Sequence, residues 1–184
     1  MAKAVLISIR PRWCELIASG KKTIEVRKTC PKIETPFKCY IYCTKDQGNK
    51  GSATHFFESE EGTFWSAGKT FAAFLSGTVI GEFVCDSIFP LSFYASDASF
   101  FDTEPPLQVP GTCLTDKEIA EYLGNGKTGY GWHISDLVIY DEPKRPSEFK
   151  RHDPTYDFSV FGEVSRTYTI NRPPQSWCYV EELI

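Results

Sequence analysis

The stretch LISIRPRWCELIASGKKTIEVRK, residues 6–28, decides how this chain begins to fold. Apolar residues alternate at Val5, Ile7 and Ile9, which predicts a strand over 4–9. Pro11 then stands where the first turn of a helix tolerates proline, an apolar stripe follows, and Ser19-Gly20 ends the helix. The alternation resumes over 23–28, so the stretch predicts a strand, a short helix and a second strand.

The second of these strands has a charged face. Successive side chains of a strand point to opposite sides, so Ile24 and Val26 share one face of a half-buried strand while Glu25 and Arg27 share the other. The side chain of Lys22 would point to the opposite face of the strand from Glu25, unless Lys22 belongs to the turn before the strand. Two interpretations stay open: an ion pair of Glu25 with Arg27 or Lys22 that organises the strand, and a reactive lysine.

The rest of the chain predicts a mixture of strands and short helices. Strands are predicted over 37–44, 77–88, 130–140 and 177–180. Gly81 lies inside one of them, at a bulge or a close approach of another backbone. Thr115 and Glu118 form a capping-box pattern that begins a helix ending at Leu123, and residues 69–75 predict another short helix. With too few helices to cover a parallel sheet, the pattern favours an α+β fold, a small mixed barrel flanked by two or three short helices.

Length and composition indicate one domain over residues 1–184, since 184 residues bury a substantial core. We expect insertions at about 45–76 and 89–114, the latter a long surface loop, and a variable segment at 150–171. No apolar run is long enough to cross a bilayer and the N-terminus lacks a signal-peptide pattern, which predicts a cytoplasmic protein.

Charge and cysteine content narrow the classes of function. The net charge of −4 argues against a protein that coats nucleic acid by electrostatics alone. Residues 10–32 are the exception, because seven basic and two acidic residues give them a local net charge of +5. The seven cysteines form no CxxC pair and no zinc-like spacing, so we predict no metal and no cofactor. Cys39 and Cys43 share a face of a strand and are expected in the core.

Five segments together resemble the ASCH-domain proteins of the PUA-like superfamily, in their bacterial and phage branch. They are LISIRPRWCELIASGKKTIEVRK (6–28), YIYCT (40–44), VIGEFVCDSI (79–88), GYGWHISDLVIYDEP (129–143) and RPPQSWCYV (172–180). The resemblance implies a PUA-like β-barrel with a cleft between the first helix, the strand after it and later loops, and a role in binding RNA.

A cleft that holds a nucleotide needs cations for phosphate, aromatic planes for stacking and fixed polar groups for the base. The matched segments contain all three kinds. The candidate ligand-binding residues are Ser8, Arg10, Trp13, Lys22, Glu25, Arg27, Lys28, Tyr130, Gln175, Ser176 and Trp177. For Trp13 and Trp132 a place in the core is the stronger interpretation.

We therefore expect a protein that binds RNA, a nucleotide or a modified nucleoside between the first helix, the following strand and the RPPQSW loop. A first alternative is an amidohydrolase of the acylated-cytidine type, which the resemblance implies through Lys22. This chain departs from that branch in having Glu25 where the branch has a threonine. If the chain is such an enzyme, Lys22 and Glu25 are the candidate catalytic residues, and Glu118 or Glu82 would be the second glutamate. A second alternative is a protein-interaction adaptor that uses Phe56, Phe57, Phe64 and Trp65.

Overall fold

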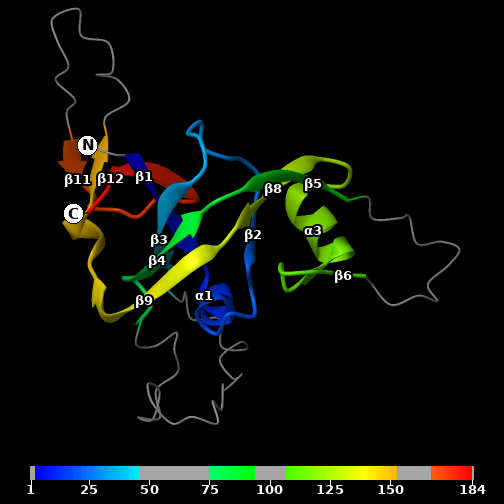
Figure 1. Cartoon of the computed structure of the whole chain (residues 1–184), viewed down its shortest axis with the longest axis horizontal. Coiled ribbons are helices and arrows are strands. Elements are labelled where there is room, and N and C mark those ends of the chain that lie inside the picture. The colour runs from blue at the N-terminus through cyan, green and yellow to red at the C-terminus, as the bar shows by residue number, and fades with distance from the viewer. Residues whose placement is uncertain (1–2, 46–74, 94–106, 153–166, 184) are drawn as a thin grey trace, which may run out of the picture. The chain divides into compact units, whose positions relative to one another are not determined.

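A computed structural model describes residues 3–45, 75–93, 107–152 and 167–183 of the chain (Figure 1). The chain divides into two compact units. Unit 1 comprises Met1–Glu15, Lys38–Glu82 and Val138–Ile184, and unit 2 comprises Leu16–Phe37 and Phe83–Leu137. The single domain expected from the length stays a prediction. The predicted helix over 69–75 and the aromatic residues of the adaptor alternative lie outside the described residues, Leu75 excepted.

Unit 1 is built on a seven-stranded sheet in the order β11-β10-β12-β1-β3-β4-β9. The strands of this sheet are β1 (Lys3–Ile9), β3 (Phe37–Cys43), β4 (Val79–Cys85), β9 (Ser135–Lys144), β10 (Lys150–His152), β11 (Thr167–Thr169) and β12 (Trp177–Glu181). Residue 37 of β3, residues 83–85 of β4 and residues 135–137 of β9 are counted with unit 2. β1 runs parallel to β3 and antiparallel to β12, and Figure 1 shows β1 and β12 side by side. Helix α1 (Pro11–Ala18) follows β1, and a 3-10 turn, η1 (Pro146–Glu148), precedes β10.

The core of unit 1 lies where β1 and β3 are buried on both faces. Every residue of β1 from Ala4 to Ile9 is buried, as expected for a central strand with neighbours on both sides. Cys39 and Cys43 are buried as well, which confirms their expected place in the core. One cluster of this core consists of Ala4, Leu6, Tyr40, Tyr42, Val79, Phe149, Ile170, Cys178 and Val180.

Gly81 lies where the backbones of β4 and β9 come unusually close, which confirms the predicted close approach. A Cβ atom at this position would lie 2.3 Å from the carbonyl oxygen of Val138. Backbone cannot yield as the end of a side chain can, so we expect Gly81→Ala to destabilise the protein by about 1–3 kcal/mol. Urea denaturation measures this. Gly20→Ala is a control with open space around the new atom, although its φ of +71° adds some backbone strain.

Unit 2 contains a three-stranded sheet, a hairpin and a helix. The sheet has the order β2 (Ile24–Arg27), β8 (Thr128–His133), β5 (Ile88–Ser92), and the hairpin joins β6 (Gln108–Val109) to β7 (Leu114–Thr115). Helix α3 (Asp116–Leu123) begins with the predicted capping box, in which Thr115 and Glu118 bond to each other's backbone N–H. Ile119 and Leu123 of α3 pack with Val26 of β2 in one core cluster of this unit.

The structure corrects several predicted elements. The strand expected over 130–140 is two strands, β8 and β9, which belong to different sheets, and Asp136 near the break has φ +46°. The segment expected to be a surface loop from residue 89 contributes β5 and β6. The α+β class is confirmed, but the described strands form three sheets and none closes into a barrel: the seven-stranded sheet ends in β11 and β9, which would have to pair.

Helices α1 and α3 are eight residues each, and nothing helical among the described residues is long and apolar enough to cross a membrane.

Candidate charged site in unit 2

Three charged side chains, those of Lys22, Glu25 and Arg27, meet at the start of β2. Because β2 begins only at Ile24, Lys22 belongs to the preceding turn, where its N–H donates to the carbonyl of Leu16. Its Nζ lies 3.4 Å from one carboxylate oxygen of Glu25, and a guanidinium nitrogen of Arg27 lies 3.0 Å from the other. Glu25 therefore bridges two cations, and both ion pairs that the sequence left open are formed.

The ammonium group of Lys22 faces three acceptors. It donates to the carbonyl oxygens of Ile24 at 2.8 Å and Thr112 at 2.7 Å, in addition to its contact with Glu25. An ammonium group has three N–H donors and no acceptor, so this arrangement suits the charged form. Burial lowers the pKa of Lys22, while the Glu25 carboxylate acts in the opposite direction. The pKa of Lys22 is lowered overall, although the three acceptors favour the charged form that burial disfavours.

All three side chains are buried. Lys22 is 2% exposed, and Glu25 and Arg27 are each 6% exposed. The prediction of a half-buried strand with an exposed polar face is wrong here, because the polar face of β2 is covered as well as the apolar one. The free-energy cost of burying these charges is reduced because Glu25 forms ion pairs with both Lys22 and Arg27.

Thr112 is a member of the site that sequence reasoning missed. The carbonyl of the preceding Gly111 accepts N–H bonds from both Thr23 and Ile24, each 2.9 Å long, which docks residues 111–112 on the start of β2. Gly111 has φ +75°, and a Cβ there would lie 2.7 Å from the Thr23 hydroxyl oxygen. The Pro-Gly pair at 110–111 predicts a turn, but it does not predict which part of the chain the turn packs against.

Exposed groups stand next to the buried ones. Lys28 follows Arg27 directly and is exposed, and its ammonium lies 5.3 Å from the ring centroid of Tyr122, which is 43% exposed. Tyr130 is half-buried and pairs with Arg27 in the sheet, so the two side chains lie on the same face. Trp132 pairs with Glu25 on that face and is fully buried, in agreement with a place in the core.

The other candidates belong to unit 1. The Ser8 hydroxyl donates to the carbonyl of Pro174 at 2.5 Å, and the Ser8 N–H donates to the carbonyl of Ser176 at 2.8 Å, so the RPPQSW loop is tied to the end of β1. Trp177 packs edge to face against Tyr179. Arg10 and Gln175 are exposed, and Trp13 is half-buried with the Arg12 guanidinium 4.8 Å from its ring centroid.

The structure brings the candidates together in two groups, one in each unit. Unit 2 holds Lys22, Glu25, Arg27, Lys28 and Tyr130, and unit 1 holds Ser8, Arg10, Trp13, Gln175, Ser176 and Trp177.

Neither proposed second glutamate is a free catalytic group. Glu118 accepts from the Thr115 N–H and hydroxyl in the capping box. Glu82, in unit 1, accepts from the Tyr140 hydroxyl at 2.5 Å and pairs with Lys38 at 3.1 Å. The described residues also contain no group of three or more His, Cys, Asp or Glu that could hold a metal ion.

The architecture defines the class: the chain has the fold of an ASCH domain, as the sequence segments predicted. It is similar to two crystal structures of the ASCH protein of Zymomonas mobilis, a tyrosine-to-phenylalanine mutant and a serine-to-alanine mutant, both 15% identical with a TM-score of 0.53. The matches cover 98% and 97% of this chain and 92% and 89% of the other chains. No family model and no curated protein matches. At this identity the likeness establishes the fold.

Proposed function

We propose that this chain binds RNA or a nucleotide through phosphate, with the charged site of unit 2 as its centre. The observation that carries the proposal is the buried set Lys22, Glu25 and Arg27. Its two cations and one carboxylate have a net charge of +1, and the carbonyl oxygens of Ile24 and Thr112 supply only partial negative charge. A phosphate beside this set would interact favourably with its net positive charge.

Stability alone is a poor reason to bury such a set. Replacing a buried ion pair or triad by well-packed apolar residues is often neutral or stabilising, because removing charges from water is costly. Two arginine or lysine side chains around one carboxylate, next to an exposed lysine, are instead suited to an anionic ligand. Lys28 supplies a further cation, and the rings of Tyr122 and Tyr130 supply planes on which a base can stack.

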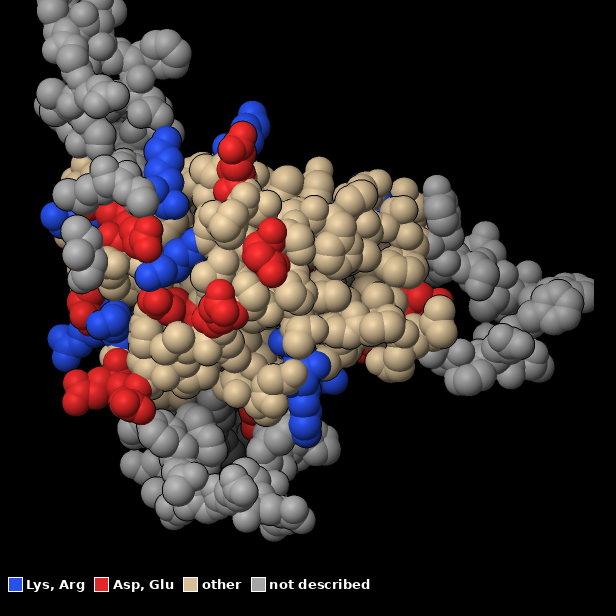
Figure 2. Space-filling view, viewed as in Figure 1, with Lys and Arg blue, Asp and Glu red and all other residues tan. Residues whose placement is uncertain are grey.

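The surface charge favours a compact ligand or a short single strand over a long duplex. On the face shown in Figure 2, Lys and Arg side chains are interspersed with Asp and Glu, and no broad area of one sign appears. The whole chain has a net charge of −4. A long duplex needs an extended basic surface, whereas one or two phosphates need only a local one.

The direct test is binding of a short single-stranded RNA over a range of salt concentrations, with Lys28→Gln compared to the wild type. If Lys28 contacts one phosphate, the slope of log affinity against log salt should become shallower by about 0.7, and affinity at low salt should fall. Lys117→Gln is the matched control, since Lys117 is also exposed in unit 2 and its side chain has no place in the site. Equal slopes for the wild type and both variants would contradict the proposal.

In unit 1, Arg10 is the candidate whose exposed guanidinium can meet a phosphate. The salt dependence of RNA binding should therefore also be measured for Arg10→Gln. We propose Ser8, Trp13, Gln175, Ser176 and Trp177 as further ligand contacts only if this variant also changes the slope.

A second candidate function, hydrolysis of an acylated cytidine by Lys22 and Glu25, has one observation in its favour: burial lowers the pKa of Lys22. The three acceptors around its ammonium oppose that role, because a base or nucleophile must first lose its proton. We therefore expect no release of cytidine from N4-acetylcytidine, followed by chromatography. Turnover that rises with pH and disappears in Lys22→Met would instead establish the enzyme.

A further inference from the structure

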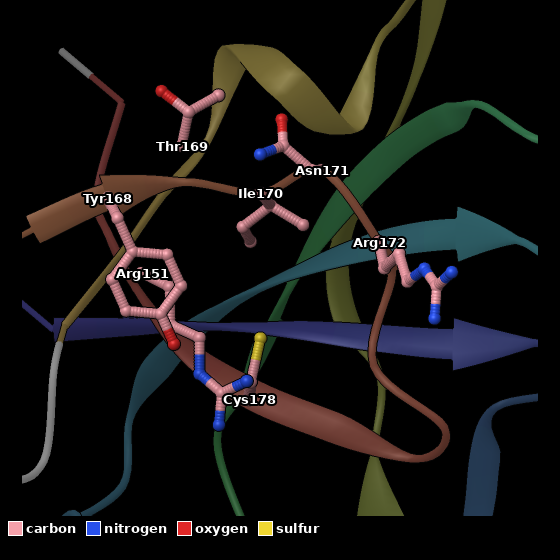
Figure 3. Close-up of a pocket in the computed structure, with 7 residues that line it drawn as sticks. All are labelled: Arg151, Tyr168, Thr169, Ile170, Asn171, Arg172 and Cys178. Carbon is pink, nitrogen blue, oxygen red and sulfur yellow. The ribbon is translucent and has the colours of Figure 1, made fainter.

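A pocket in unit 1 contains none of the candidate site residues discussed above. It has a volume of about 360 Å³ and is lined by Arg151, Tyr168, Thr169, Ile170, Asn171, Arg172 and Cys178 (Figure 3). Pockets for small molecules begin at roughly 300 Å³. We propose that this pocket binds a small ligand that carries a phosphate monoester and a planar ring, the chemistry of a nucleoside monophosphate.

Strand pairing explains why these side chains converge. Arg151 of β10 pairs with Tyr168 of β11 on one side and with Val180 of β12 on the other, and directly paired residues share a face. Ile170 and Arg172 follow Tyr168 at intervals of two residues, and Cys178 lies two residues before Val180. Figure 3 shows Arg151 beside Tyr168, and Arg172 at the other end of the group with its guanidinium directed away from them.

The floor of the pocket is apolar and buried. Ile170 is 3% exposed and Cys178 is 5% exposed, and both belong to the core cluster of unit 1. The N–H of Ile170 donates to the carbonyl of Phe149 at 3.1 Å, which holds the chain in place just beyond the end of β11. A preformed apolar floor with a few polar groups at its rim is the usual construction of a small-molecule site.

The rim is positively charged. Among the described residues no carboxylate lies within ion-pair distance of Arg151 or Arg172, so both side chains bring uncompensated positive charge to the lining of the pocket. Burial raises the pKa of the Cys178 thiol to about 11, and the neutral thiol leaves that charge uncompensated. Two guanidinium groups match a phosphate dianion in charge and in fork geometry.

The remaining polar and aromatic groups suit a ring. Tyr168 is 46% exposed, so its ring presents a face on which a base can stack. Asn171 offers both a carbonyl acceptor and an amide donor, which is the combination that reads the edge of a base. A bare anion would use the arginines but not these two groups.

The experiment is isothermal titration calorimetry of the full chain with uridine monophosphate, uridine, ribose 5-phosphate and inorganic phosphate. Uridine monophosphate is expected to bind most tightly, and Arg151→Gln and Arg172→Gln should each weaken it by at least about tenfold. Tyr168→Leu should weaken uridine monophosphate by about fivefold or more while leaving ribose 5-phosphate unchanged.

Lys150→Gln is the matched control. Lys150 is the neighbour of Arg151 on β10, is exposed, and points to the other face of the strand, so its removal should leave binding unchanged. If either glutamine variant fails to fold, Arg151→Lys or Arg172→Lys replaces it in the experiment. Lysine keeps the positive charge but cannot form the bidentate hydrogen bonds of a guanidinium group, so this variant should still bind uridine monophosphate more weakly than the wild type.

Any of three results with the wild type would overturn the proposal: no binding of any phosphate-bearing probe, equal affinities for uridine and uridine monophosphate, or affinity for inorganic phosphate equal to that for the nucleotide. Equal binding by the wild type and both arginine variants would do the same. Lys28→Gln separates this pocket from the site proposed in unit 2, because it should leave the calorimetric affinity for uridine monophosphate at the pocket unchanged.

Discussion

Glu25→Gln should destabilise the protein by about 3–5 kcal/mol, since it removes the one carboxylate that bridges the ammonium of Lys22 and the guanidinium of Arg27. The glutamine has nearly the same shape, so the loss reports charge and not packing. Both cations remain buried, and burying a charge without its partner is far more costly than burying the pair. Urea denaturation followed by circular dichroism measures the change in the free energy of unfolding.

Two further variants make this prediction specific. Glu121→Gln changes an exposed carboxylate on α3 and should stay within about 0.5 kcal/mol of the wild type. Lys22→Met combined with Glu25→Gln should be more stable than Glu25→Gln alone, because one of the stranded charges is gone. A loss below about 1 kcal/mol for Glu25→Gln would show that water or another group reaches this site and replaces the carboxylate.

Trp132→Ala should cost about 3–5 kcal/mol of stability, since it truncates the largest fully buried side chain among the described residues. The ring of Trp132 packs edge to face against Phe37 within unit 2, with 6.1 Å between ring centroids and 81° between ring planes. Truncation removes both the buried apolar surface and this aromatic contact, and it leaves a cavity beside Glu25.

The same denaturation experiment tests it, with Leu107→Ala as the control. Leu107 is an apolar residue of unit 2 that is 69% exposed, so its loss should change stability by no more than about 0.5 kcal/mol. If Trp132→Ala cost as little as the control, Trp132 would not be part of the core, and the interpretation of this residue as a stacking surface would return.

Local patterns predicted the elements well where one segment of chain was sufficient to form them. The strand, helix and strand of residues 6–28, the capping box at Thr115 and Glu118, and the last strand near Trp177 all appear with ends within about two residues of the prediction. In each case the signal is a periodicity or a cap, and these depend on residues a few positions apart.

The break between β8 and β9 was missed for the opposite reason. Residues 130–140 are continuously strand-like, and nothing local marks His133 to Ser135 as the point where the chain leaves one sheet and enters another. Which strand pairs with which is decided by partners far away in sequence. The short strands β5, β6 and β7 were hidden in the same way within a Pro- and Ser-rich segment.

The candidate sites also have features that the sequence predicts and features that only the tertiary structure shows. The sequence by itself determined that Glu25 and Arg27 share a face, that a cationic stretch follows the first helix, and that the chain has an ASCH fold. Only the tertiary structure decided that Lys22 reaches Glu25 from the turn, that Thr112 supplies it with an acceptor, and that Arg151 and Arg172 line one pocket. The physical reason is range: alternation acts between neighbours along the chain, whereas burial and convergence of charge depend on segments that meet only after the sheets have formed.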